Sequence, residues 1–152
     1  MTFNSNKNVR KDKANLQKWI WQYEKRGINK ANKPQYLKWK SKLSKIEVQQ
    51  RQIKLIAKIV ENFTGDKPNK EGESIAKKLM CKWCLENGIK VSYINWYMNW
   101  NSYAVNTAYN IRKRFTSSFK NAENKIVWQR FKQYIDRKLS NNKTSAPVRY
   151  KH

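Results

Sequence analysis

The residues best suited to chemistry in this sequence are two cysteines, Cys81 and Cys84, in the motif CKWC. A redox pair of this spacing needs a strand–helix–strand setting, and a structural zinc ion needs four ligands. The sequence has no second cysteine pair, and its single histidine is His152. We therefore interpret both cysteines as reduced thiols on one face of a helix, and we predict no metal site.

Other catalytic sites are equally hard to build from this sequence. The 10 Asp and Glu residues are scattered singly, whereas a metal-dependent nuclease needs several converging carboxylates. The 4 glycines form neither a G-x-G-x-x-G turn nor a Walker loop. The sequence therefore predicts a binding protein that is not an enzyme, with no catalytic residues and no cofactors.

The charge of the chain is its strongest signal. Over 152 residues, 34 Lys and Arg face 10 Asp and Glu, which gives a formal charge of +24. Such a charge destabilises a compact domain unless a polyanion binds, and nucleic acid is the commonest one, because basic side chains at phosphates release counterions. The sequence therefore predicts binding to duplex DNA, with RNA left open and with acidic proteins or a membrane surface as weaker alternatives.

Membrane insertion and secretion are not indicated. No stretch approaches the roughly 18 consecutive apolar residues of a transmembrane helix. Residues 1–13 are polar and basic, without the apolar segment of a secretory signal. Because 7 Trp, 8 Tyr and 5 Phe supply the volume for a core, we expect a folded protein. The two cysteines, interpreted as reduced thiols, favour an intracellular location.

Apolar residues recur at helical spacing along the chain, and no strand-like alternation persists, which predicts an all-α fold. The pattern favours helices over 14–26, 34–43, 45–63, 75–87, 92–101, 103–119 and 122–139. A capping box at Ser44–Glu47 favours a separate helix over 45–63. One continuous helix over 34–63 is the alternative, because no Gly or Pro interrupts it.

The tetrad Trp96-Tyr97-Met98-Asn99 lies in the third of three successive predicted helices within 53–103. It resembles the W-F-x-N signature of the homeodomain recognition helix. In that family the two aromatic residues pack in the core, and the Asn contacts adenine in the major groove. The resemblance implies a homeobox-like, helix-turn-helix unit that binds DNA. Trp100 and Asn101 follow the tetrad, where homeodomains carry basic residues.

Composition, helical periodicity and this resemblance together divide the sequence into five segments. They are a basic flexible tail (1–13), an N-terminal helical extension (14–43), the homeobox-like helical unit (44–103), C-terminal helices (104–139) and a disordered tail (140–152). Homeodomains carry a basic arm before their first helix, and four lysines occupy that place here: Lys38, Lys40, Lys42 and Lys45. Helical periodicity around these lysines favours a helix over a flexible arm.

Two sets of residues are predicted to contact DNA. The first set lies on and beside the predicted recognition helix. In this set, Asn95, Asn99 and Ser102 recur at i, i+4 and i+7 and form one polar ridge. Lys90 and Asn101 complete the set. The second is the densest basic cluster, suited to phosphates: Arg112, Lys113 and Arg114, followed by Lys120.

The sequence is also similar to the small homeobox-like accessory subunits of ciliate DNA N6-adenine methyltransferase complexes. That resemblance implies a nuclear, non-catalytic subunit that helps a partner methyltransferase to engage duplex DNA. Two alternatives stay open. One is a structural assembly subunit that docks partner proteins through exposed aromatic faces, with Trp19, Trp21, Trp39 and Trp128 as candidates. The other is a helix-turn-helix regulator of replication or transcription.

Overall fold

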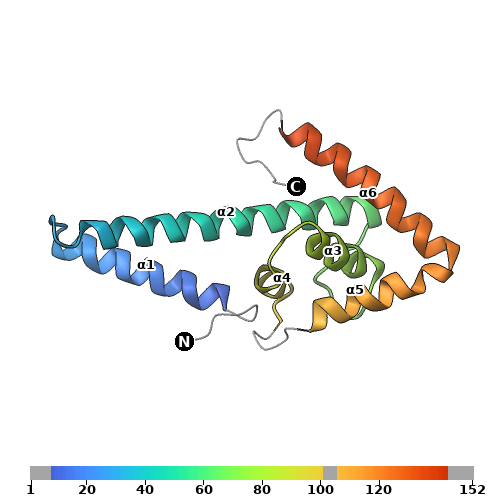
Figure 1. Cartoon of the computed structure of the whole chain (residues 1–152), viewed down its shortest axis with the longest axis horizontal. Helices are drawn as coiled ribbons and strands as arrows, with labels where there is room; N and C mark the ends of the chain where they lie inside the picture. The colour runs from blue at the N-terminus through green and yellow to red at the C-terminus, as the bar shows by residue number, and fades with distance from the viewer. Residues whose placement is uncertain (1–7, 101–105, 144–152) are drawn as a thin grey trace.

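The computed structural model describes residues 8–100 and 106–143, and every regular element within these ranges is a helix. The predicted all-α class is therefore confirmed for the described residues. The elements are α1 (Val9–Arg26), α2 (Lys33–Thr64), α3 (Ile75–Glu86), α4 (Val91–Met98), α5 (Thr107–Ser117), η1 (Ser118–Lys120) and α6 (Ala122–Lys143) (Figure 1). Among these helices, none is long and apolar enough to cross a membrane.

Helix α2 runs without interruption for 32 residues, so Ser44 does not begin a new helix. The alternative of one continuous helix is correct, and the separate helix over 45–63 is wrong. Helix α2 ends at Thr64 and is capped by Gly65, whose φ of 82° is left-handed and whose N–H donates to the Glu61 carbonyl at 2.7 Å. Without Gly or Pro between Pro34 and Gly65, the local capping signal is too weak to break the helix.

The first half of α2 and the whole of α1 form an antiparallel hairpin that projects from the rest of the molecule (Figure 1). We call residues 9–51 the hairpin. Its apolar residues recur every three or four positions, as in paired helices: Leu16, Ile20 and Tyr23 on α1, and Trp39, Leu43 and Ile46 on α2. The Trp39 ring contacts Trp19 and Tyr23, with centroids 5.3 and 4.8 Å away. Lys13 Nζ donates to Gln50 Oε1 at 2.9 Å.

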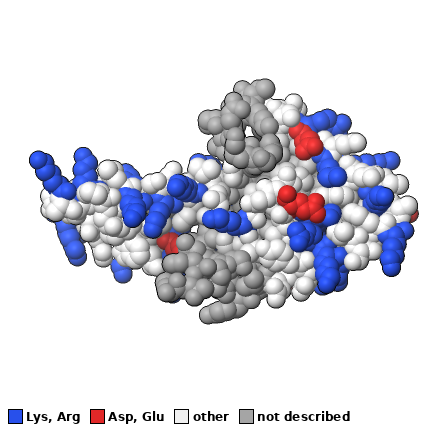
Figure 2. Space-filling view, viewed as in Figure 1, with Lys and Arg blue, Asp and Glu red and all other residues white. Residues whose placement is uncertain are grey.

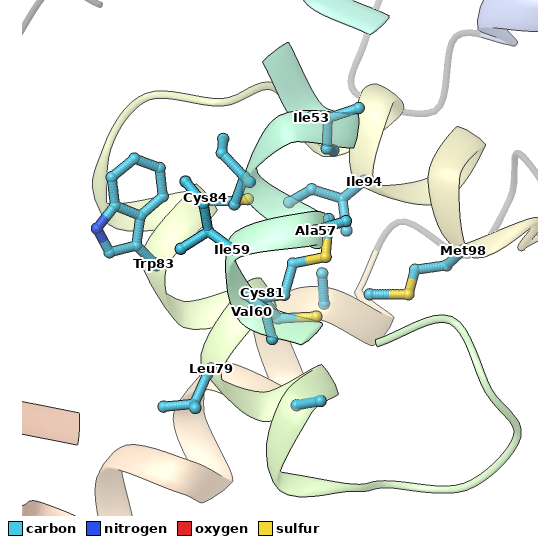
Figure 3. Close-up of a cluster of buried hydrophobic side chains, with 14 of the residues drawn as sticks. Ile53, Ala57, Ile59, Val60, Leu79, Cys81, Trp83, Cys84, Ile94 and Met98 are labelled. Atoms are coloured by element: carbon cyan, nitrogen blue, oxygen red, sulfur yellow. The ribbon is translucent and has the colours of Figure 1, made fainter. Parts of the chain in front are cut away.

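One hydrophobic core joins the six α-helices of residues 8–100 and 106–143. It includes Val9 at the start of α1 and Leu139 near the end of α6, with the second half of α2 and α3 at its centre (Figure 3). Because this cluster is continuous, the predicted segments 44–103 and 104–139 do not have separate cores.

The ends of several helices differ from the predicted ones. Helix α1 begins at Val9 rather than residue 14, because the Asn8 side chain accepts a hydrogen bond from the Lys11 N–H at 3.0 Å and Val9 is buried. Helix α6 extends to Lys143, so residues 140–143 are helical and not part of a disordered tail. The helix predicted from residue 103 begins at Thr107, and 101–105 lie outside the described residues.

Cys81 and Cys84 both lie on α3, with free, buried thiols among the core side chains (Figure 3). Burial raises the pKa of the Cys81 thiol from 9.0 to about 12, and it raises the pKa of Cys84 well above the same starting value. Both thiols are therefore protonated near neutral pH, and they act as small apolar residues of the core.

Candidate nucleic-acid interface

The predicted recognition helix is mostly a core element. Helix α4 has 8 residues, and its first five, 91–95, are all buried. Trp96 and Tyr97 are half-buried and pack against the core, which is the role that the homeodomain resemblance implies for them. Little of α4 is left to enter a DNA groove.

The predicted polar ridge on this helix is wrong. Helix α4 ends at Met98, and Asn99 has a left-handed φ of 59°. The N–H groups of Asn99 and Trp100 turn back to the carbonyls of Trp96 and Asn95 at 3.2 and 2.9 Å, which closes the helix. Asn99 is exposed, but it lies past the helix end and not in line with Asn95. Asn101 and Ser102, the other predicted contacts here, lie outside the described residues.

Asn95 is 3% exposed, so its side chain cannot reach a base edge in this arrangement. Its Oδ1 and Nδ2 atoms are both buried, and neither has a hydrogen-bond partner within the described part of the chain. A small pocket beside it is lined by Arg10, Trp96 and Trp100. Burial of an unpaired amide is unfavourable. A substitution at Asn95 therefore tests whether this residue of α4 contributes to DNA binding or only packs in the core.

We expect Asn95→Leu to keep or raise the free energy of unfolding, by about 0–2 kcal/mol, because Leu removes two unpaired polar atoms at similar volume. Urea denaturation followed by circular dichroism measures this. Affinity for duplex DNA should not change. If the variant is as stable as the parent but binds DNA more weakly, α4 contributes to DNA contact after all.

The predicted basic cluster on α5 is only partly available. Lys113 is exposed, and so is Lys120 in the following η1 turn. Arg114 is tied to Glu73 by an ion pair of 2.6 Å. Arg112 is half-buried, and its guanidinium lies 5.6 Å from the centroid of the Tyr109 ring. Of the three charges at 112–114, only Lys113 is therefore both exposed and without an ion pair within the described residues.

The hairpin carries the densest free charge. Residues 8–51 contain 13 Lys and Arg against 3 acids. In the part of the chain that the structure describes, no ion pair involves a Lys or Arg of this segment. Basic side chains line the projecting hairpin and also cover the far end of the molecule, around α5 and α6 (Figure 2).

The middle of the molecule is closer to neutral. Residues 52–106 contain 8 Lys against 5 acids, and two of these lysines are buried. Lys77 Nζ donates to the Lys70 carbonyl at 2.6 Å, and Lys82 Nζ donates to Glu86 at 2.6 Å and to Thr116 at 2.7 Å. These two ammonium groups donate hydrogen bonds within the protein and are not available to a phosphate.

A groove of about 430 Å³ lies where the hairpin meets the start of α4. Leu16, Ile46 and Tyr93 line it with apolar surface. Lys42, Lys45 and Lys90 also line it. The structure thus brings the predicted site residue Lys90 to the hairpin lysines, far along the chain, and not to the cluster on α5. No periodicity in the sequence signals this groove, because three separate helices form it.

No protein-family model, curated protein or solved structure matches this chain. The resemblance to homeodomains therefore rests on the Trp96–Asn99 tetrad and on the order of the helices.

Proposed function

We propose that this protein is a non-catalytic accessory subunit that binds duplex DNA by charge, with the hairpin as its main phosphate-binding surface. The observation that carries this proposal is the row of hairpin lysines without ion pairs among the described residues. Each such lysine that reaches a phosphate releases counterions condensed on the DNA. The entropy gained by these released ions therefore supplies much of the binding free energy.

The burial of α4 supports sequence-tolerant binding. Recognition of a DNA sequence needs side chains that reach the base edges in a groove, while phosphate contacts only position the protein. Of the predicted contacts on α4, Asn95 is buried, and Asn99, the Asn of the tetrad, is exposed but lies past the end of the helix. The hairpin, in contrast, presents exposed lysines at helical spacing along α2. We infer that affinity varies little between DNA sequences of the same length.

A salt titration tests the proposal. The logarithm of the association constant for a duplex should fall linearly with the logarithm of the salt concentration, with a slope of about −0.9 for each phosphate neutralised. Fluorescence anisotropy on two duplexes of unrelated sequence measures both the slope and the sequence tolerance. A flat salt response would overturn the proposal.

The proposed protein partner and cellular location rest on the resemblance alone. By analogy with homeobox-like accessory subunits, the partner is a DNA adenine methyltransferase and the location is the nucleus. The protein would then help that enzyme to engage duplex DNA.

A second candidate function, assembly with a partner protein, is favoured by apolar surface on the same hairpin. Trp21 is 58% exposed and Leu37 is 52% exposed, and exposed apolar residues of this size mark docking surfaces when they form a patch. Of the other candidate residues, Trp19 is exposed, Trp39 is half-buried and Trp128 is buried. The exposed tryptophans among these candidates therefore lie on α1 and not on α6.

A further inference from the structure

We propose that the groove between α1, α2 and the start of α4 holds one unstacked base of a single-stranded nucleic acid, with the neighbouring phosphates at Lys42 and Lys45. The inference rests on the proposed function, since nucleic acid is the partner in both. It adds a defined site and a single-stranded class of ligand.

The size and position of the groove fit this ligand. Its volume of about 430 Å³ lies within the roughly 300–1,000 Å³ of pockets that hold small ligands. Lys42 and Lys45 come from the same row of α2, and Lys38 continues that row one turn toward the hairpin tip. A backbone that follows this row would keep its phosphates beside ammonium groups while one base turns into the groove.

An aromatic side chain is held ready for stacking. Trp19 lines the groove and is 40% exposed, while its ring rests against Trp39 at a centroid distance of 5.3 Å. The contact with Trp39 holds the indole in place and leaves part of it accessible. Stacking of a base on such a ring tolerates any sequence, because every base has a π-face.

The groove also has groups for the polar edge of a base. The Asn15 and Gln49 side chains line it, and neither amide makes a hydrogen bond within the described residues. Each amide offers a donor and an acceptor, the pair that base edges require. Asp12 lines the groove as well, and its negative charge disfavours a phosphate beside it. The phosphates therefore belong beside the lysines and the base beside the amides.

The alternative occupant is an acidic peptide with an aromatic side chain. The Asn15 and Gln49 amides favour a base over such a peptide, since an apolar aromatic side chain in the groove would leave both amides unpaired. A base within a duplex cannot enter, because both of its faces are stacked and its Watson–Crick edge is paired. Single-stranded binding and duplex binding thus use the same hairpin in different ways.

The test compares oligo(dT) with an abasic oligonucleotide of the same length and charge. Only base contacts separate the two probes, so we expect the full-length protein to bind oligo(dT) roughly tenfold more tightly. Trp19→Leu should bring this ratio close to one, and Trp19→Phe should restore most of it. Trp21→Leu is the matched control, because Trp21 is exposed on the same helix but does not line the groove. It should keep the ratio of the parent.

A second variant guards against a folding defect in Trp19→Leu. Asn15→Trp fills the groove from α1 and leaves Trp19 in place, so it should also abolish the preference for oligo(dT). Equal affinity of the parent for the two oligonucleotides overturns the groove proposal, and so does a ratio that survives both groove variants. So does displacement of bound oligo(dT) by an equal concentration of an acidic peptide with an aromatic side chain. In each case, salt-dependent duplex binding would remain, whereas loss of all nucleic-acid binding would instead refute the proposed function.

Discussion

Replacing Lys38, Lys42 and Lys45 together by Gln should weaken duplex DNA binding roughly 100- to 1,000-fold at 0.1 M salt. The magnitude follows from counterion release, because each phosphate contact contributes about a factor of ten at this salt concentration. Of these three side chains, none is in an ion pair within the described residues, so all three charges are available. The slope of the salt titration should become shallower by about 2.7.

The matched variant replaces Arg112, Lys113 and Arg114 by Gln and removes the same number of charges. It should weaken binding only about tenfold, because Arg114 is paired with Glu73 and Arg112 is half-buried against Tyr109, so Lys113 alone contributes one full contact. Anisotropy titrations at three salt concentrations compare the two variants, after circular dichroism shows that both are folded. A larger loss for the α5 variant would move the main DNA surface from the hairpin to the C-terminal helices.

Phe131→Ala should lower the free energy of unfolding by about 3–5 kcal/mol, a large share of the stability of a domain this size. Phe131 on α6 is 0% exposed, and its ring lies between Phe63 and Trp128 at centroid distances of 5.4 and 6.2 Å. The smaller side chain would leave a cavity between α6 and α2. Urea denaturation, followed by circular dichroism and by tryptophan fluorescence, measures the loss.

The control on the same helix is Ile126→Ala, whose side chain is exposed and should change stability by less than about 0.5 kcal/mol. Because one core joins α2 to α6, both probes should report a single transition for Phe131→Ala. Two separate transitions would instead indicate that residues 44–103 fold as an independent unit, as the homeodomain resemblance implies.

Local signals predicted the helices well and their continuity less well. The end of α1 before Gly27 and the end of α2 before Gly65 were predictable because a glycine follows each helix. Both glycines have positive φ in the structure. Ser44 carried an equally clear capping signal, yet α2 passes through it, because packing of both its halves outweighs one side-chain hydrogen bond. Periodicity also missed the start of α1, where Val9 is buried by contacts far along the chain.

The candidate site was harder to predict than the fold. The tetrad at Trp96–Asn99 correctly placed two aromatic residues against the core, but it could not show that α4 ends at Met98. The burial of Asn95 and the pairing of Arg114 with Glu73 depend on neighbours distant in sequence. The density of basic residues could be read from the sequence, but whether each basic side chain is exposed or ion-paired could not.

The length of α2 sets a scale for the complex with DNA. A helix of 32 residues is about 48 Å long, and a duplex alongside it spans about 14 base pairs. That length of duplex carries about 28 negative charges, close to the +24 of the protein. On the proposed function, a DNA molecule covered end to end by this protein would be nearly electroneutral. Neighbouring filaments would then lose the repulsion that keeps them apart, and the covered DNA would tend to condense.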